Sequence, residues 1–315
     1  MPDEYTIRGV KDVEELEKIP YTERVKENST TKLLENGAKI NPDAPAISFI
    51  LNGDTYDQPS VISYSQFIGK IRQTANMLYD LGIRPGDVVT YVLPNLPQTH
   101  YVLWGAEAAG IANPINPLLE PGTIKDICTS ANTKVLVALG EMSGTDIWQK
   151  IDSIRREIPT LEYVVRVMGP SDKSENIIGY DEVVESYPAD RYTFERNIDP
   201  DEIASLYHTG GTTGTPKLAR RTHYNEVVMT YDLHIMGGIT SSSTLLCGLP
   251  LFHCNGTLVT GLCPFSFGGH VIILSPLGYR DQSIMKNFFK IVEKYQAETF
   301  SAVPTVLSVL LDMEV

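Results

Sequence analysis

Short apolar runs and segments with helical spacing alternate along the chain, in the order expected for repeated βα units. Residues 88–93 form a continuous β-prone run, which is typical of a strand buried on both faces of a parallel sheet. Residues 65–81 instead place Phe67 and Leu78 on one helical face, and this segment ends at Gly82. The alternation predicts an α/β fold with doubly wound, mostly parallel sheets.

Two series of βα units, separated by a polar region at 168–201, predict two sheets packed with helices in αβαβα layers. The expected strands are 46–50, 61–64, 88–93, 111–115, 134–139, 161–167, 203–207, 244–249, 271–274 and 299–302. The expected helices are 31–41, 65–81, 97–109, 121–131, 145–157, 181–186, 225–236, 255–267, 281–295 and a last one from residue 304. We expect residues 1–85 with 223–315 to form one sheet layer, and residues 86–222 the other.

Charge and cysteine content exclude several classes of function. With 26 basic and 39 acidic residues the net charge is −13, which argues against nucleic acid or an anionic membrane surface as a standing partner. The four cysteines lack metal-ligand or disulfide spacing, and no Gly-x-Ser-x-Gly segment supports hydrolase chemistry. Prolines, glycines and histidines interrupt the uncharged run 233–279 before it could span a membrane. The acidic N-terminus lacks a secretory signal, so we expect a cytoplasmic protein.

A glycine- and threonine-rich segment between Thr209 and Lys217 carries the strongest chemical signal. Its glycines let successive backbone N–H groups point into one concavity, and its hydroxyls add donors, which suits phosphate oxygens. Arg220 and Arg221 follow, so positive charge is concentrated here in an acidic chain. The candidate phosphate-binding residues are Thr209, Gly210, Gly211, Thr212, Thr213, Gly214, Thr215 and Lys217.

Two common phosphate-binding patterns do not fit this segment. A Walker A loop needs Gly-Lys-Ser/Thr, whereas Pro216 precedes Lys217 and Leu218 follows it. The Gly-x-Gly-x-x-Gly of dinucleotide-binding folds is also absent. The structural alternative is a surface Gly/Thr hairpin. For His253, which follows the strand at 244–249, the alternative to lining a ligand site is packing at the strand end.

The segment Thr-Gly-Gly-Thr-Thr-Gly-Thr-Pro-Lys at 209–217 resembles the phosphate loop of the adenylate-forming superfamily. Phe252 and His253, after a Pro-Leu step, resemble a second motif of its acyl-CoA synthetase branch, where it lines the passage between acyl pocket and nucleotide. Gly210 replaces a common Ser or Thr, as in fatty acyl-CoA synthetases. Thr222-His223 also resembles a family step, in which His223 is either a base or a packing and capping residue.

This resemblance implies the N-terminal portion of the acyl-CoA synthetase fold, and the activation of a carboxylic acid through acyl-adenylate to acyl-CoA. A fatty acid is the substrate that we expect. It implies ATP, Mg²⁺ and coenzyme A as cofactors and co-substrates. It also implies catalytic roles for Thr212, Lys217 and His253, with Thr212 contacting Mg²⁺.

The chain departs from the family pattern in what it lacks. We find no aromatic-Gly-x-Thr-Glu segment, no Thr-Gly-Asp, and no small C-terminal domain, so we expect the chain to be truncated and inactive on its own. Two alternatives stay open, a non-catalytic nucleotide or acyl binder and an adenylating domain that loads a carrier protein. The sequence does not specify the length of the acid or the oligomeric state.

Overall fold

The computed structural model describes residues 7–209 and 217–313, whose strands form two sheets. The five-stranded sheet has the order β12-β10-β11-β1-β2 and contains β1 (Pro45–Ile50), β2 (Ser60–Ser63), β10 (Thr244–Cys247), β11 (His270–Leu274) and β12 (Thr299–Phe300). The seven-stranded sheet has the order β7-β6-β5-β3-β4-β8-β9 and contains β3 (Val88–Val92), β4 (Ile111–Pro114), β5 (Thr133–Leu139), β6 (Tyr163–Val167), β7 (Ile177–Gly179), β8 (Ile203–His208) and β9 (Leu218–Thr222). In each sheet one edge strand, β2 or β9, is antiparallel to its neighbour. The predicted α/β fold with two mostly parallel sheets is confirmed.

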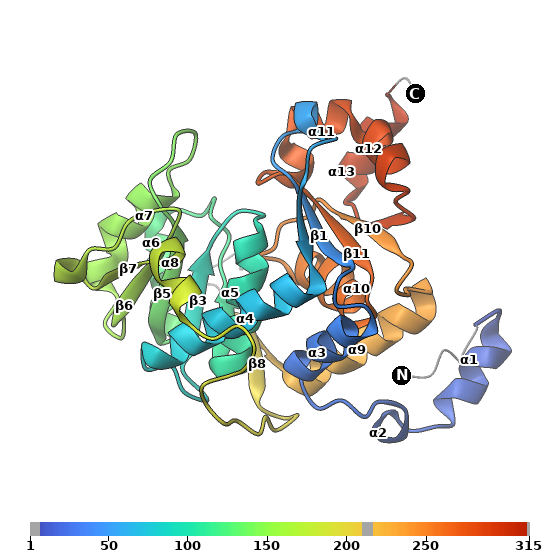
Figure 1. The fold of residues 1–315 in the computed structure, drawn as a ribbon, viewed down its shortest axis with the longest axis horizontal. Coiled ribbons are helices and arrows are strands. Elements are labelled where there is room, and N and C mark those ends of the chain that lie inside the picture. The colour runs from blue at the N-terminus through green and yellow to red at the C-terminus, as the bar shows by residue number, and fades with distance from the viewer. Residues whose placement is uncertain (1–6, 210–216, 314–315) are drawn as a thin grey trace.

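Helices cover the sheets and also separate them. They are α1 (Val10–Glu17), α2 (Tyr21–Arg24), α3 (Thr30–Ile40), α4 (Tyr64–Asp80), α5 (Pro97–Ala109), α6 (Pro121–Ser130), α7 (Ile147–Ile154), α8 (Tyr180–Val183), α9 (His223–Gly237), α10 (Cys263–Ser266), α11 (Gln282–Lys286), α12 (Phe288–Tyr295) and α13 (Pro304–Leu311). Helix α4 packs on β1 and β2, α5 packs on β3 and β4, and the two helices pack against each other. They therefore form the middle of the layered structure, with one sheet to each side (Figure 1).

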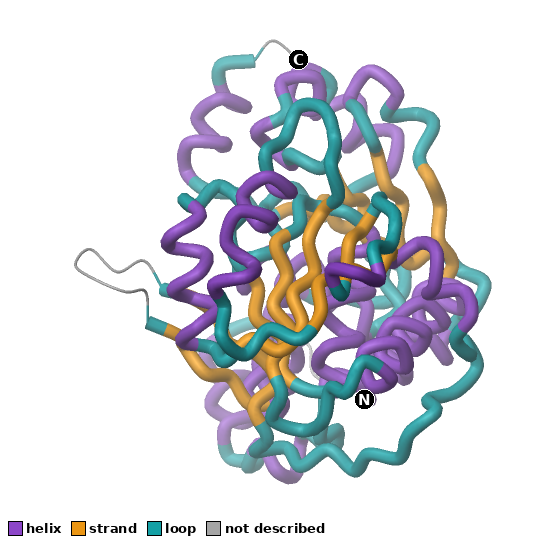
Figure 2. Tube along the Cα trace, turned by 90° about the vertical axis from the view of Figure 1, so that its left-hand side faces the viewer, coloured by secondary structure: helices purple, strands orange, loops and turns teal. Residues whose placement is uncertain are grey.

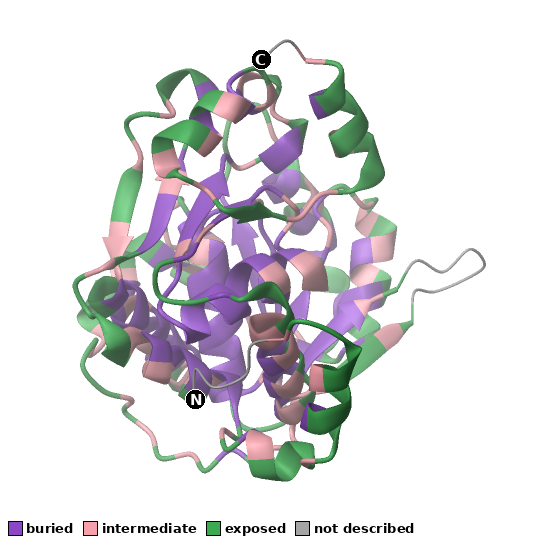
Figure 3. Ribbon diagram, turned by 90° about the vertical axis from the view of Figure 1, so that its right-hand side faces the viewer, coloured by how far each residue is buried: buried purple, intermediate pink, exposed green. Residues whose placement is uncertain are grey.

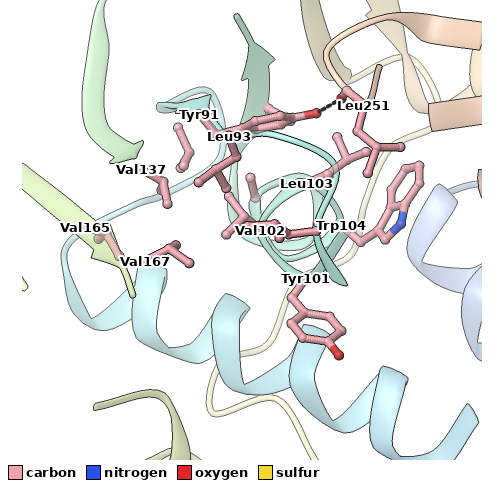
Figure 4. Packing of buried hydrophobic residues seen from close by; sticks show 14 of the residues in the cluster. Tyr91, Leu93, Tyr101, Val102, Leu103, Trp104, Val137, Val165, Val167 and Leu251 are labelled. Atoms are coloured by element: carbon pink, nitrogen blue, oxygen red, sulfur yellow. Dashed lines mark hydrogen bonds between the residues drawn. The ribbon is translucent and has the colours of Figure 1, made fainter. Parts of the chain in front are cut away.

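The largest apolar core lies around α5 and the strands of the seven-stranded sheet. Val102, Leu103 and Trp104 of α5 are buried in one cluster with Val137 of β5 and Val165 of β6, and Figure 4 shows Val102 on the side of these strands and Trp104 on the opposite side of α5. Figure 3 shows the buried residues concentrated in the strands and the central helices, whereas the outer helices are exposed. Removing a large apolar side chain of this kind from water contributes about 1.5–3 kcal/mol.

Helix α4 begins and ends where its sequence predicts. The Ser63 hydroxyl accepts a hydrogen bond from the Gln66 N–H, and the Gln66 side chain accepts one from the Ser63 N–H, which is a capping box. Beyond the helix, Gly82 has a φ of 90°, which only glycine adopts without strain. Asn76 of α4 is buried, and its amide donates hydrogen bonds to Pro188 O and Arg191 O, which satisfy its polar group inside the protein.

The structure corrects several details of the prediction. Strands β7 and β9 were not expected, since β7 is very short and β9 contains two arginines. The helix expected at 281–295 is interrupted at Asn287, between α11 and α12. The helix expected at 255–267 begins as a π-helical segment, η5 (Asn255–Leu262), in which Thr260 has non-helical dihedral angles, and it continues as α10.

Figure 2 shows the strands in the interior with helices on both sides. Over residues 7–209 and 217–313, no helix combines the length and the apolar character that crossing a membrane requires.

Candidate functional site

A cavity of about 1180 Å³ lies at the carboxyl ends of parallel strands from both sheets. The seven-stranded sheet contributes Asn116, which follows β4, and His208 and Thr209 at the end of β8. The segment after β10 contributes Phe252 and His253. Doubly wound sheets bind ligands at this edge, and the volume is slightly above the usual range of about 300–1,000 Å³ for pockets that bind small organic ligands. The cavity is the candidate functional site.

The hairpin of β8 and β9 holds the two ends of the candidate phosphate loop together. The Thr209 N–H donates a hydrogen bond to Lys217 O over 2.9 Å, which extends the antiparallel pairing of the two strands by one step. Thr209 lines the cavity, and Lys217 is exposed beside it. The other predicted loop residues lie outside the described residues; they are Gly210, Gly211, Thr212, Thr213, Gly214 and Thr215.

One face of this hairpin carries polar residues toward the cavity. Ser205 pairs with Arg221 across the two strands, and Tyr207 pairs with Ala219. Directly paired residues share a face of a sheet, so these four residues lie on one side. Tyr207, Ala219 and Arg221 line the cavity. The hydroxyls of Tyr207 and Thr257 are 2.7 Å apart, and this hydrogen bond attaches β8 to η5.

Hydrogen bonds between the two sheets position the segment that carries Phe252 and His253. The Asn95 amide donates to Leu249 O and accepts from the Leu251 N–H, over 3.1 and 3.0 Å. The Tyr91 hydroxyl donates to Leu251 O over 2.6 Å (Figure 4). A Cβ at Gly256 would lie 2.5 Å from Pro250 O, so the turn after His253 requires glycine at this position.

Two histidines from different sheets meet in the cavity. His253 Nδ1 accepts a hydrogen bond from the Asn255 N–H over 3.2 Å, so a neutral ring carries its proton on Nε2. His208 Nε2 accepts one from the Asn116 N–H, also over 3.2 Å. Burial lowers the pKa of His208, and repulsion from His253 lowers it further. His208 is therefore neutral near pH 7, while His253 offers an Nε2–H donor.

A polar cluster lies behind the hairpin, buried between α3, α5 and α9. Glu226 Oε1 accepts a hydrogen bond from the Ser205 hydroxyl over 2.5 Å, and Glu107 Oε2 accepts one from the Thr30 hydroxyl over 2.6 Å. Burial, and then the neighbouring Glu226 carboxylate, raise the pKa of Glu107 well above its ordinary value. Burial also raises the pKa of Glu226, although Arg221 opposes this shift. The pair therefore holds a proton at Glu107, and Glu226 is the partner that faces a cation.

His223 belongs to this cluster and not to the cavity. Its ring is fully buried, and its Nδ1 lies 3.2 Å from the Thr30 hydroxyl. Burial lowers the pKa of His223 to about 4. The preceding Thr222 caps α9 by accepting a hydrogen bond from the Asn225 N–H. Of the two roles considered for His223, the packing role fits these contacts.

The described wall of the cavity contains donors that suit a nucleotide and its magnesium ion. Thr209, Thr123, Asn116 and Asp126 supply hydroxyl, amide and carboxylate oxygens, the ligand type that Mg²⁺ prefers. Within residues 7–209 and 217–313, no group of three or more His, Cys, Asp or Glu residues could hold a metal ion. This donor set fits a Mg²⁺ ion that arrives bound to phosphates and keeps several waters.

Comparison with known proteins identifies the family. A profile of the AMP-binding enzymes matches residues 34–315. The chain belongs to the AMP-binding enzyme family. A marinolic acid–CoA ligase of Pseudoalteromonas sp. (strain SANK 73390) is 33% identical over 314 residues, which are 98% of this chain and 48% of that protein. An oxalate–CoA ligase of Arabidopsis thaliana is 28% identical over 282 residues, which are 89% of this chain and 51% of that protein.

Solved structures of AMP-binding enzymes share the fold. The anthranilate CoA ligase AuaEII in complex with anthranoyl-AMP superposes with a TM-score of 0.76 at 20% identity, covering 95% of this chain and 53% of that one. A Mycobacterium tuberculosis fatty acyl CoA synthetase superposes with a TM-score of 0.71 at 20% identity, covering 90% of this chain and 51% of that one. The chain thus spans about half the length of these relatives. The recognition of an acyl-CoA ligase relative and of its fold is confirmed.

Sequence reasoning missed three residues that the structure places at or behind the cavity. His208 was not among the candidate residues, yet it lines the cavity with His253. Arg221 had been noted as local positive charge, but its partner Glu226 had not. The alternation of side chains in β9 would have placed Arg221 on the face of Ala219, had the strand been recognised.

Proposed function

We propose that the protein in its full length activates a carboxylic acid with ATP and transfers the acyl group to coenzyme A. The observation that carries this proposal is the single cavity that brings Thr209, at the base of the phosphate loop, to Phe252 and His253. These residues come from two sheets and match two separate motifs of the family. The acid–CoA ligases among the relatives support the same activity.

The proposed reaction has two steps. A carboxylate oxygen of the acid attacks the α-phosphorus of ATP, which gives acyl-adenylate and pyrophosphate; the CoA sulfur then attacks the acyl carbon, and AMP leaves. We assign to Lys217 and the Thr209 hydroxyl, by resemblance, the stabilisation of charge on the leaving pyrophosphate, and the position of Thr209 in the cavity wall supports this role. We assign Thr212 to the Mg²⁺ ion by resemblance. The Nε2–H of His253 is available to donate to an oxygen of the acyl group.

We further propose that the acid is a fatty or related acid. The cavity has an apolar side formed by Met229 of α9 and by Leu258 and Val259 of η5, which suits an aliphatic chain. The names of the relatives do not decide this point, because they include marinolic acid, oxalate and fatty acyl substrates.

The test is pyrophosphate exchange into ATP by the full-length protein, with a broad panel of carboxylic acids. We expect exchange that depends on the acid, and a decrease of about 10- to 1000-fold in Lys217→Ala if this cation stabilises transition-state charge. Lys173→Ala is the matched control, since Lys173 is exposed and does not line the cavity. Absence of exchange with every acid would refute the ligase assignment and favour a non-catalytic binder. Equal use of a carrier protein and CoA would favour the carrier-loading alternative.

Three further expectations belong to this proposal. The 315-residue chain by itself should not catalyse exchange, since it lacks the family's adenine-contacting and ribose-holding motifs. Residues 1–85 with 223–315, and residues 86–222, should behave as two subdomains in limited proteolysis. The protein should be found in the cytoplasm, which cell fractionation would test.

A further inference from the structure

Arg221 brings a cation to the part of the cavity wall that also contains Tyr207 and Ala219. Of the described residues that line the cavity, Arg221 is the sole lysine or arginine. Its side chain is 17% exposed, so most of it is enclosed by protein. Its guanidinium carbon lies 5.5 Å from the centre of the Tyr207 ring, which also lines the cavity. Arg221 is therefore fixed against the wall and does not extend into solvent.

A buried carboxylate holds Arg221 from behind. Arg221 Nε lies 3.8 Å from Glu226 Oε1, and Glu226 is fully buried. The Ser205 hydroxyl donates to the same oxygen, and Ser205 is the residue paired with Arg221 across the hairpin. Ser205 on β8 and Glu226 on α9 thus set the direction of the Arg221 guanidinium.

The guanidinium retains hydrogen-bonding capacity. An arginine has five N–H donors, and the contact with Glu226 involves Nε. Within residues 7–209 and 217–313, no acceptor is hydrogen bonded to the Arg221 guanidinium. A planar donor group of this kind is suited to one or two oxygens of a ligand.

The position of Arg221 separates it from the phosphates. Arg221 and Lys217 are four residues apart on an extended strand, which corresponds to about 13 Å at the usual rise. Beside this part of the cavity, Met229 of α9 and Leu258 of η5 provide apolar surface. A ligand at Arg221 is therefore more consistent with the chain of the acid than with the ATP phosphates.

We propose that Arg221 is a specificity-determining residue that selects an acid carrying a second oxygen on its chain, a hydroxyl or carbonyl group that accepts hydrogen bonds from the guanidinium. This inference rests on the proposed acid activation at the same cavity. The Glu226 carboxyl group lies 3.8 Å from Arg221 Nε, and a second carboxylate would have to be desolvated beside it, so a neutral oxygen is favoured. An unsubstituted acid would leave the guanidinium without an acceptor, which is a strong basis for rejection.

The test compares three series of straight-chain acids of matched carbon number: unsubstituted, ω-hydroxy and α,ω-dicarboxylic acids. Pyrophosphate exchange by the full-length protein gives kcat and KM for each acid, and calorimetric titration without ATP gives Kd. Varying the length moves the second oxygen along the cavity. We expect the best ω-hydroxy acid to exceed its unsubstituted counterpart by about 10-fold or more in kcat/KM.

Arg221→Leu should abolish this preference, because KM for the hydroxy acid rises while kcat/KM for the unsubstituted acid also rises, since that acid no longer leaves a guanidinium without an acceptor. Arg220→Leu is the matched control, because Arg220 is the exposed neighbour on β9 that does not line the cavity. If Arg221→Leu does not fold, Arg221→Lys carries the test, since it keeps the charge and loses the planar donor group. Glu226→Gln should shift the preference toward the dicarboxylic acids, because the cation then lacks its counter-charge.

The outcomes separate this inference from the proposed function. The role of Arg221 is overturned if exchange shows no preference for the oxygenated acids, or if Arg221→Leu loses exchange activity equally with all three series. The ligase assignment stays intact in both cases. Tighter binding of hydroxy acids without exchange supports Arg221 and overturns the ligase assignment. If neither binding nor exchange is observed with any acid, both are wrong.

Discussion

Two buried regions of the same helix, α5, differ in composition: one is mainly apolar, and the other contains a carboxyl group. Along one part of α5 and the adjacent α4, Trp104 and Phe67 pack mainly among apolar side chains, together with the buried ring of His100, and the rings of Phe67 and Phe265 are centred 4.5 Å apart. Near the end of α5, Glu107 is equally buried but contacts Thr30 and the Glu226 carboxyl group. The first region stabilises the fold through burial, whereas the second holds a charged side chain beside the cavity.

The difference shows what each region contributes. Apolar packing is non-directional, so many combinations of side chains would serve between α4 and α5. A buried carboxyl pair costs desolvation energy and is often no more stable than apolar residues would be. Its retention here is accounted for by the fixed direction that it gives to Arg221.

The largest effect on stability should come from the apolar region. Phe67→Ala should lower the free energy of unfolding by about 3–5 kcal/mol, because it leaves a cavity between α4, α5 and α10. Urea denaturation followed by tryptophan fluorescence would measure it. The same change at Phe300, which is 36% exposed, is the control and should cost much less. Equal losses at the two positions would show that the core is not centred on α4 and α5.

An intermediate effect is expected in the polar region. Glu226→Leu should lower the free energy of unfolding by about 1–3 kcal/mol, since the Ser205 hydroxyl loses its acceptor and Arg221 loses its nearby carboxyl group. Glu226→Gln keeps an oxygen for the Ser205 hydroxyl and should cost less. A Glu226→Leu protein as stable as the wild type, measured in the same urea experiment, would mean that the carboxylate is not needed to hold the cluster together.

Glu107 should make stability depend on pH. Because its pKa is raised in the folded protein, folding binds a proton, and the free energy of unfolding falls as pH rises above the ordinary pKa of the carboxyl group. Glu107→Gln removes this pH-dependent contribution of the carboxyl group. As the pH rises, the free energy of unfolding of the variant relative to that of the wild type should therefore increase by up to about 1.4 kcal/mol per pH unit. Urea titrations above pH 7 avoid His223, whose pKa is lowered to about 4 and which is neutral there in both states. A constant difference between the two proteins would contradict the shared proton.

The smallest effect should come from a local feature that belongs to neither region. Ser63→Ala removes the cap of α4 and should cost about 1 kcal/mol. Ser65→Ala is the neighbouring control, because its hydroxyl donates to Pro42 O and does not cap the helix. A larger loss for Ser65→Ala in thermal denaturation would reverse the assignment of the cap.

Most of the fold could be predicted because its signals are local. The run at 88–93 became a strand buried along its whole length, and Pro97 and Gly110 bound α5 as expected. Strand β9 was missed because Arg220 and Arg221 do not look like strand residues until a partner strand is known. Tertiary pairing with β8 overrides this weak propensity.

The functional site could be predicted from the sequence only at positions that belong to a recognisable motif. Thr209 and His253 were chosen from motifs far apart in the sequence, and the cavity contains both. The contacts of Glu107 with Glu226, and of Glu226 with Arg221, involve elements that only the folded chain brings together. For Glu107 the signal in the sequence is a single carboxylate in α5, which by itself does not identify a partner, and for Glu226 this signal is missing because α9 also contains Asp232.

A structure of the protein with a bound non-hydrolysable acyl-adenylate analogue would test the account most directly. We predict the phosphate near Thr209, the acyl group passing His253, and the acyl chain continuing between α9 and η5 toward Arg221. An analogue bound outside this cavity, or inside it with its acyl chain directed away from α9 and η5, would contradict the account.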